Sequence, residues 1–208
     1  HMPKIGDRLL EMYKHPKMFK FLHLPLQSGH NEVLEKMRRR YTVQKFIKII
    51  DQFKSVPNLN VMTDVIVGFP GVTDEHFWGT LQAVRRVSPD SINISRFWSR
   101  TGTPAAEMEQ LPGEVIKKRS KVLTDIFHNI SKLQNEKWLD WEGEIVISER
   151  GRDNQWIGRN DSYKPVIVEG SYKLGDVLKV KVVKTGLFDL RAKVITDLSK
   201  KEEMRILE

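Results

Sequence analysis

The sequence predicts an α/β fold, with about half of a parallel β/α barrel followed by a small all-β barrel of the OB type. Strand and helix patterns alternate through the first two thirds of the chain, whereas the pattern after residue 139 has the period of two that is typical of strands. One long helical pattern separates them. We therefore expect one domain over residues 1–138, a second over 139–198, and a charged tail over 199–208.

The first domain has the pattern of consecutive β-α-β units. We expect strands over 21–25, 60–69 and 91–97, and helices over 31–39, 43–54 and 73–87, with Asn31 and Thr73 as N-caps. The strands begin about 30 to 40 residues apart, the spacing of parallel strands joined by a crossover helix. Three strands are too few to close a barrel. We therefore expect either a further part of the barrel upstream or open sheet edges that pair with another chain.

The long helix and the second domain follow from the change of period. Apolar residues recur at helical spacing from Pro112 to about Lys137, and Trp138, Trp141 and Gly143 mark the exit from this helix. Short alternating runs then predict strands over 144–149, 155–159, 165–169, 177–184 and 190–195. Such a series of short strands with glycines between them is typical of an OB-like barrel.

Composition and charge limit the kind of protein. The chain has 208 residues and a net charge of +8, and residues 140–208 contribute none of it because they hold 13 Lys and Arg against 13 Asp and Glu. A basic surface suits a phosphate-rich partner. No apolar run approaches the roughly 18 residues that a membrane span needs. We therefore expect a cytoplasmic protein that makes no membrane contact.

The cysteine and histidine content excludes several kinds of site within this chain. Without cysteine the chain forms no disulfide, thiolate zinc site or thiolate-held iron–sulfur cluster. Its six histidines include no pair at the i, i+4 spacing of a helical metal site. We therefore expect structural or solvent roles, and no metal ligation, for His15, His23 and His30. A hydrolase is disfavoured because neither a Cys nucleophile nor a G-x-S-x-G turn is present.

Polar or glycine-rich segments follow each predicted parallel strand. Gln27 and Ser28 come after the first strand, Asp64 interrupts the apolar second strand, and Arg96 begins the segment at the end of the third. Ligands of parallel α/β folds bind at the carboxyl ends of the strands. A carboxylate such as Asp64 needs a partner or a wet cavity there. The three segments together predict one wall of a ligand site, although each alone also fits ordinary turn chemistry.

Several longer runs resemble a known family. The runs His23–Gly29, Asn31–Tyr41, Thr63–Gly71 and Gly102–Ala106 closely resemble motifs of the radical-SAM methylthiotransferases. The resemblance extends over nearly the whole chain, and its last part resembles the TRAM domain that ends these enzymes. It implies the C-terminal part of a radical-SAM β/α barrel followed by a TRAM RNA-binding β-barrel.

The resemblance also implies cofactors. The complete enzymes use S-adenosylmethionine and two [4Fe–4S] clusters to attach a methylthio group to an unactivated carbon. The cluster ligands are cysteines, so we expect a Cys-x3-Cys-x2-Cys run upstream and no activity from this fragment alone. Two departures from the family pattern are His30, where the family usually has serine, and Phe97-Trp98-Ser99, where it usually has Tyr-Ser-Pro.

Seven residues receive roles from the resemblance. Asp64 would orient polar groups near the substrate or bond to the backbone, and Arg96 would contact the methionine carboxylate or the substrate; these two are the catalytic candidates. The other five are the cofactor-binding candidates. Gln27 and Ser28 would face the ribose or methionine end of the cofactor. The adenine would be bordered by Gly68, Phe69 and Pro70.

The substrate and the RNA-binding residues are also implied by resemblance. The segment Ala105–Pro112 looks most like the archaeal and eukaryotic branch, which modifies N6-threonylcarbamoyladenosine beside the anticodon of tRNA. A ribosomal-protein aspartate methylthiotransferase and a stand-alone RNA-binding module remain alternatives. The second domain mixes cations with rings, as RNA-binding OB-like surfaces do, although Trp156 and Tyr163 equally fit packing within the barrel. The candidates for RNA contact are Arg150, Arg152, Trp156, Arg159, Tyr163, Lys164, Lys179 and Lys181.

Overall fold

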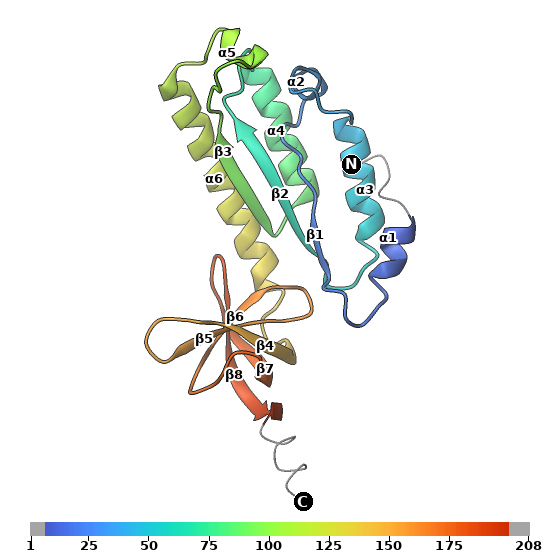
Figure 1. Cartoon of the computed structure of the whole chain (residues 1–208), viewed down its shortest axis with the longest axis vertical. Helices are drawn as coiled ribbons and strands as arrows, with labels where there is room; N and C mark the ends of the chain where they lie inside the picture. Colours follow the sequence, from blue (N-terminus) through green and yellow to red (C-terminus); the bar gives the residue numbers. More distant parts are fainter. Residues whose placement is uncertain (1–6, 200–208) are drawn as a thin grey trace, which may run out of the picture.

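A computed structural model describes residues 7–199, which form an α/β part joined by a long helix to a β-barrel (Figure 1). The first part contains α1 (Asp7–Met12), β1 (Phe21–His23), α2 (Asn31–Lys36), α3 (Val43–Phe53), β2 (Asn60–Val67), α4 (Asp74–Val87), β3 (Ser91–Arg96), α5 (Pro104–Glu107) and α6 (Gly113–Glu136). The barrel contains β4 (Glu142–Arg150), β5 (Gln155–Arg159), β6 (Pro165–Glu169), β7 (Val177–Thr185) and β8 (Leu190–Asp197). Among the described helices, none has the length and apolar character needed to cross a membrane.

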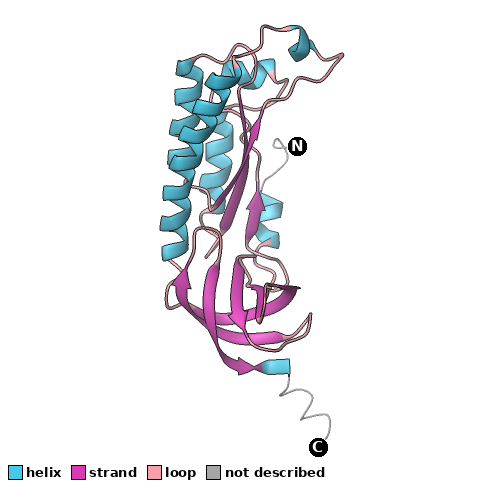
Figure 2. Cartoon of the chain, turned by 90° about the vertical axis from the view of Figure 1, so that its left-hand side faces the viewer, coloured by secondary structure: helices cyan, strands magenta, loops and turns pink. Residues whose placement is uncertain are grey.

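The first part is built on a parallel sheet with the strand order β1-β2-β3. Helices α3, α4 and α6 pack on one face of this sheet and leave the other face open (Figure 2). Side chains alternate along β2, so that Val65 and Val67 are buried under the helices while Asp64 and Ile66 lie on the open face. The predicted parallel sheet is confirmed, and its open face is the side that a ligand can approach.

The second part is a closed barrel in the order β4-β5-β6-β8-β7. Its interior is filled by apolar side chains with no exposed surface, among them Ile145, Val166, Leu178 and Leu190. The predicted OB-like barrel is therefore confirmed. Strands β5 and β6 have the predicted bounds, whereas β4 and β8 extend further than the alternation of the sequence indicates. Of the predicted tail only Ser199 is described, and its Oγ accepts a hydrogen bond from Val177 N–H at 2.8 Å; the rest lies outside the described residues.

The predicted N-caps had different outcomes. Thr73 caps α4 as predicted, and it forms a reciprocal capping box with His76, the third residue of the helix. The prediction for Asn31 was wrong, because His30 occupies the N-cap position of α2. Asn31 instead faces α3, where its Oδ1 accepts the Val43 N–H at 2.9 Å. Its side chain therefore joins two helices.

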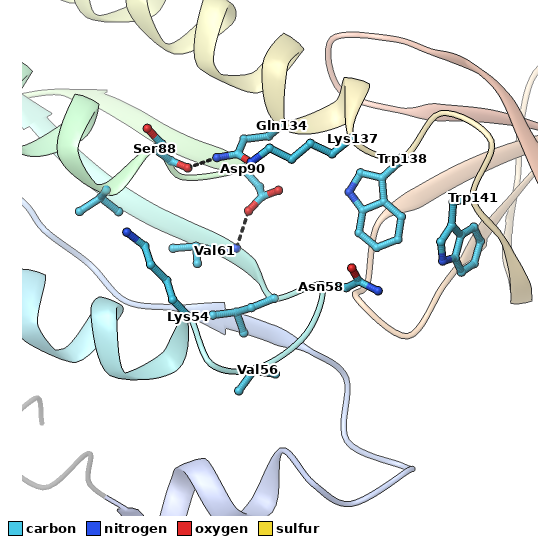
Figure 3. Close-up of a pocket in the computed structure, with 12 residues that line it drawn as sticks. Lys54, Val56, Asn58, Val61, Ser88, Asp90, Gln134, Lys137, Trp138 and Trp141 are labelled. Atoms are coloured by element: carbon cyan, nitrogen blue, oxygen red, sulfur yellow. Dashed lines mark hydrogen bonds between the residues drawn. The ribbon is translucent and has the colours of Figure 1, made fainter.

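The barrel is fixed to the amino ends of the parallel strands. The Asn60 side chain donates to the Ser162 carbonyl at 2.9 Å, and Ser131 on α6 donates to the Leu187 carbonyl at 2.7 Å. A cavity of about 450 Å³ lies at this junction, with Trp138 and Trp141 on its barrel side (Figure 3). The two parts therefore meet through specific polar contacts as well as through the connecting helix.

Lys164, which was predicted to contact RNA, lies inside this junction. Its Nζ is 2.8 Å from Asp90 Oδ1 and 2.7 Å from Asn135 Oδ1. The side chains of Lys164 and Asp90 are only 6% and 10% exposed, respectively. The prediction for Lys164 was wrong because a buried ammonium group that is already paired cannot reach a phosphate on the surface.

Candidate functional site

A cavity of about 720 Å³ opens on the free face of the parallel sheet, at the carboxyl ends of its strands. The loops after β1, β2 and β3 meet at this end of the sheet (Figure 1). Of the seven sequence-predicted site residues, Gln27, Asp64 and Arg96 line the cavity. The structure therefore brings together at least one candidate from each strand.

Gln27 is held in place by its backbone. Its N–H donates to the Asp64 carbonyl at 2.8 Å, and its carbonyl accepts the Ile66 N–H at 2.9 Å, so that it extends the β1–β2 pairing by an isolated bridge. Its φ of 63° lies in the left-handed region, which costs a non-glycine residue about 1–2 kcal/mol. Such a conformation persists only where the surroundings impose it. The bridge to β2 thus fixes Gln27 at the edge of the cavity.

Ser28 has a different position from Gln27. It is buried, it is absent from the cavity lining, and its Oγ lies 3.4 Å from the His30 N–H. This contact supports the turn that leads into α2. The structure therefore places Ser28 behind Gln27, in the loop itself.

Tyr41 supports the same loop from the following helix–turn segment. Its hydroxyl is 3.1 Å from the Pro25 carbonyl and 3.2 Å from the Leu26 carbonyl. Burial raises the pKa of the Tyr41 phenol, an effect that nearby Asp64 reinforces and Arg39 opposes. The hydroxyl therefore remains a hydrogen-bond donor well above neutral pH. Sequence reasoning gave Tyr41 no role, because nothing local indicates that it reaches back to residues 25 and 26.

Asp64 has both a partner and a cavity. Its Oδ2 is 2.9 Å from Nε2 of His23, which lies on the same open face of the neighbouring strand. Asn93 is the register partner of Asp64 on β3 and lines the cavity as well. These three polar side chains make the floor of the cavity a hydrogen-bonding surface, which suits a polar ligand better than an apolar one.

The segment after β2 packs behind the cavity. Gly68 has φ of 87°, and a Cβ there would lie 2.6 Å from Ile116 Cγ1 of α6, so only glycine fits. Phe69 is buried and contacts Phe97 edge to face, with ring centroids 5.2 Å apart. Pro70 is buried too. None of these three lines the cavity, whereas Phe97 does.

Three arginines belong to the lining of this cavity. Arg39, Arg96 and Arg100 all line it and are exposed, and Asp64 is the only carboxylate among its lining residues. The cavity is therefore net positive and suited to an anionic group. Sequence reasoning found Arg96 but missed the other two, which come from the Arg38–Arg40 run and from the segment after β3.

The remaining RNA-contact candidates lie on the barrel and differ in how they are held. Arg150 lies over the Trp156 ring at 5.8 Å, and Arg159 lies over the Tyr163 ring at 4.9 Å. The two rings also pack: Trp156 lies against the barrel core, and Tyr163 contacts Phe19 at 5.0 Å. Trp156 thus packs within the barrel, the alternative left open by the sequence, whereas Tyr163 is 41% exposed and the rings that it contacts lie in the α/β part.

Some of the charged RNA-contact candidates are paired with carboxylates, and others are exposed. Arg159 is paired with Glu149 at 2.8 Å. Hydrogen bonds and charge from Glu142 and Asp140 raise the pKa of Lys181, which is already neutralised by them on the surface. Arg150, Arg152 and Lys179 are exposed. The exposed cations with the best access to a phosphate backbone are therefore these three.

Family comparisons agree with the two-part architecture. A model of the Radical SAM superfamily matches residues 2–84, and a TRAM-domain model matches residues 142–195. A protein of Archaeoglobus fulgidus named probable threonylcarbamoyladenosine tRNA methylthiotransferase is 35% identical over 88% of this chain and 43% of its own length. One of the same name from Pyrococcus abyssi is 41% identical over 85% and 43%. The threonylcarbamoyladenosine tRNA methylthiotransferase of Homo sapiens is 34% identical over 94% and 34%.

The chain thus spans less than half the length of these relatives. A solved structure of coproporphyrinogen III oxidase from Escherichia coli, described as a radical SAM enzyme, superposes on 88% of the chain with a TM-score of 0.54 at 13% identity, and covers 45% of that structure. At this identity the likeness supports the fold alone. The chain therefore combines a segment of a radical SAM domain with a TRAM domain, and it is a homologue of the proteins named threonylcarbamoyladenosine tRNA methylthiotransferases.

Proposed function

We propose that this chain is the C-terminal part of a tRNA methylthiotransferase that acts on N6-threonylcarbamoyladenosine beside the anticodon. The observation that carries the proposal is a polar, net positive cavity at the carboxyl ends of a radical SAM sheet, in a chain whose homologues bear that name. The TRAM barrel, which we assign to residues 139–198, supports tRNA as the partner. We propose the cytoplasm as the compartment because the relatives are named for tRNA modification. The α/β part would occupy residues 1–138.

The residues of this chain suit S-adenosylmethionine, whereas they offer no ligands for an iron–sulfur cluster. The cofactor is a nucleoside with a charged amino-acid end, and Gln27, Asp64 and Arg96 offer an amide, a carboxylate and a guanidinium to such groups. When bound, it would supply the reductive cleavage that activates the substrate carbon. Thiolates hold iron–sulfur clusters, and the sequence has none, so both clusters would belong to another part of the complete enzyme.

The residues of this chain would bind and orient the reactants. Gln27 would hold a polar end of the cofactor, because its backbone bridge to β2 fixes it at the cavity edge. Gly68, Phe69 and Pro70 would act indirectly from their position behind the cavity. The Phe69 ring packs on Phe97 and would keep it in place beside the adenine. The open sheet edges at β1 and β3 would pair with the rest of the barrel or, in the isolated chain, with a second copy.

The proposed reaction can be tested on tRNA itself. We expect tRNA from a strain lacking the gene to contain N6-threonylcarbamoyladenosine without its methylthio derivative, and the complete gene to restore it, as measured by mass spectrometry of digested nucleosides. Ribosomal proteins should be unchanged. A methylthio group missing from a ribosomal aspartate, with tRNA unaffected, would instead favour the ribosomal-protein alternative.

The cofactor assignment predicts a difference between two neighbouring residues. In the complete enzyme we expect Gln27→Ala to weaken S-adenosylmethionine binding about tenfold, the value of one good hydrogen bond. Ser28→Ala should have a smaller effect, because its hydroxyl faces the His30 N–H. Equilibrium dialysis measures both, with Gln44→Ala on the exposed side of α3 as the control. Equal affinity of Gln27→Ala and the parent enzyme would contradict the assignment.

A further inference from the structure

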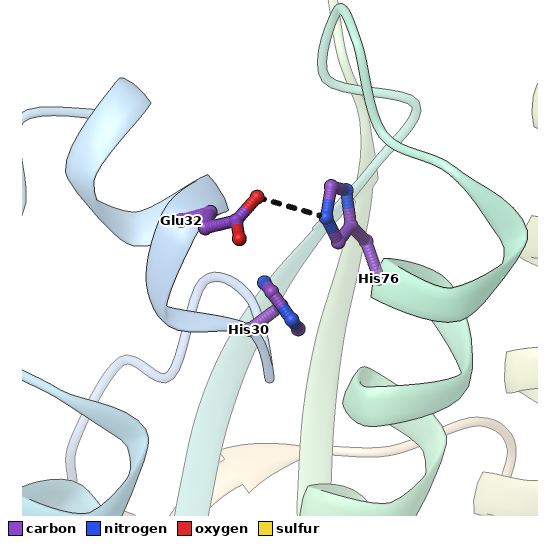
Figure 4. A group of neighbouring side chains, drawn as sticks. All are labelled: His30, Glu32 and His76. Carbon is purple, nitrogen blue, oxygen red and sulfur yellow. Dashed lines mark ion pairs between the residues drawn. The ribbon is translucent and has the colours of Figure 1, made fainter.

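Three side chains that commonly bind metal ions meet outside the set that lines the cavity. His30 is the N-cap residue of α2, Glu32 lies in its first turn, and His76 lies in the first turn of α4 (Figure 4). One donor atom from each lies within 4.8 Å of the other two. Sequence reasoning missed this group, because His30 and His76 come from different β-α units and do not share a helix.

The backbone brings the two histidines together. Gly29 and Gly79 face each other so closely that a Cβ on Gly29 would lie 2.4 Å from the Gly79 carbonyl oxygen. The Gly29 N–H also donates to Thr80 Oγ1 at 2.9 Å. As a result the rings of His30 and His76 lie with their centroids 4.3 Å apart. Protein contacts alone therefore hold the loop after β1 against α4.

The donor spacing suits a small transition-metal ion. His76 Nε2 and Glu32 Oε2 are 3.3 Å apart. Two ligands bound at about 2.1 Å in tetrahedral geometry lie about 3.4 Å from each other. His30 Nδ1 is buried and has no hydrogen-bond partner among the described residues, so it has an unused lone pair or proton in the group. The remaining separations, all within 4.8 Å, would have to shorten to complete a three-ligand site.

We propose that His30, Glu32 and His76 bind one divalent transition-metal ion of the Zn²⁺ type, with water as the fourth ligand. Two imidazoles and one carboxylate are a ligand set that zinc accepts with an open position. The ion would join α4 to the loop that carries Gln27 and Ser28, so that it stabilises the wall of the proposed cofactor site from behind. This proposal rests on the geometry of the three side chains and does not depend on the proposed methylthiotransferase activity.

Binding would exchange one hydrogen bond for a metal bond. Without an ion, His76 Nδ1 accepts the Thr73 N–H at 3.2 Å, so the ring proton lies on Nε2, which faces Glu32. An ion on Nε2 replaces that proton, and Nδ1 then takes up a proton and gives up the Thr73 N–H. The other half of the capping box, from His76 N–H to Thr73 Oγ1 at 3.2 Å, is unaffected. The start of α4 therefore stays capped.

The test is a Zn²⁺ titration of this chain by calorimetry after treatment with a chelator. We expect one ion per chain, and at least tenfold weaker binding for His30→Asn, Glu32→Gln and His76→Gln. His76→Gln is the sharpest variant, because glutamine at the third helical position keeps the capping box while it removes the imidazole. Its far-UV circular dichroism and thermal unfolding without metal should match those of the parent chain. The control is His15→Gln, which changes an exposed histidine elsewhere and should bind Zn²⁺ like the parent.

Two further measurements separate a built site from surface binding. Co²⁺ should give the intense visible absorption of tetrahedral coordination in the parent chain and lose it in His76→Gln. Affinity for Zn²⁺ should fall more than tenfold from pH 8 to pH 5.5, because imidazole ligands must be unprotonated. The proposal is overturned if His76→Gln binds Zn²⁺ as tightly as the parent, or if His15→Gln loses binding to the same extent as the three ligand variants.

Discussion

Asp90→Ala is expected to lower the free energy of unfolding of this chain by about 3–5 kcal/mol, because it removes one partner of a buried ion pair. Asp90 Oδ1 is 2.8 Å from Lys164 Nζ, and Oδ2 accepts the Val61 N–H at 2.8 Å. The variant therefore leaves a buried ammonium group with Asn135 as its remaining partner among the described residues, and it leaves a backbone donor of β2 unsatisfied. Urea denaturation followed by tryptophan fluorescence measures the loss, since Trp138 and Trp141 lie at the same junction.

A second substitution, at Lys164, tests whether its unpaired charge causes the loss of stability in Asp90→Ala. In Asp90→Ala/Lys164→Met the uncompensated charge is gone, so the double variant should be more stable than Asp90→Ala alone. Asp90→Asn should fall between the parent and Asp90→Ala, because its amide oxygen can still accept the Val61 N–H. If the single and double variants unfold at the same urea concentration, the burial of the Lys164 charge is not what makes Asp90 important.

The elements that local patterns determine were predicted well from the sequence. The spacing of the strands at residues 21, 60 and 91 predicted a parallel sheet, and the period of two after residue 139 predicted the barrel. The errors at element ends have local causes. The first strand stops at His23, before Pro25, whose missing N–H cannot continue a ladder. The helix from Asn31 ends early, and Arg38 follows it with φ of 55°.

The sequence predicted those residues of the candidate site that the pattern of a single strand indicates. Gln27 and Arg96 followed from polar residues at strand ends and Asp64 from a carboxylate inside an apolar strand, and all three line the cavity. Phe69 was expected to border the adenine; its ring packs on Phe97 of the segment after β3, and Phe97 lines the cavity. Lys164 was read as exposed because lysine usually is, and its partner Asp90 belongs to the other part of the chain. Contacts between distant segments determine both positions, and no local pattern indicates them.

The TRAM barrel gives the second large prediction. In the complete enzyme, Arg150→Glu/Arg152→Glu is expected to weaken tRNA binding by about 100-fold at moderate salt, if each arginine contacts the RNA backbone. Both residues are exposed, at the end of β4 and in the turn that follows it, and Arg150 lies over the Trp156 ring. Filter binding at several salt concentrations measures the affinity. The slope of log K against log salt should decrease in magnitude by about 2, because two phosphate contacts are lost.

A matched charge change elsewhere separates local contact from net charge. Lys45→Glu/Lys48→Glu alters two exposed residues of α3, outside the barrel, and changes the net charge of the chain by the same amount. This control should lose much less affinity and keep the parent salt slope, since charges beyond about 10 Å are largely screened at 0.1 M salt. Equal losses in the two double variants would mean that the barrel arginines act only through the overall field. RNA recognition by this face of the TRAM domain would then have to be abandoned, whereas the assignment of the cavity to the cofactor would be unaffected.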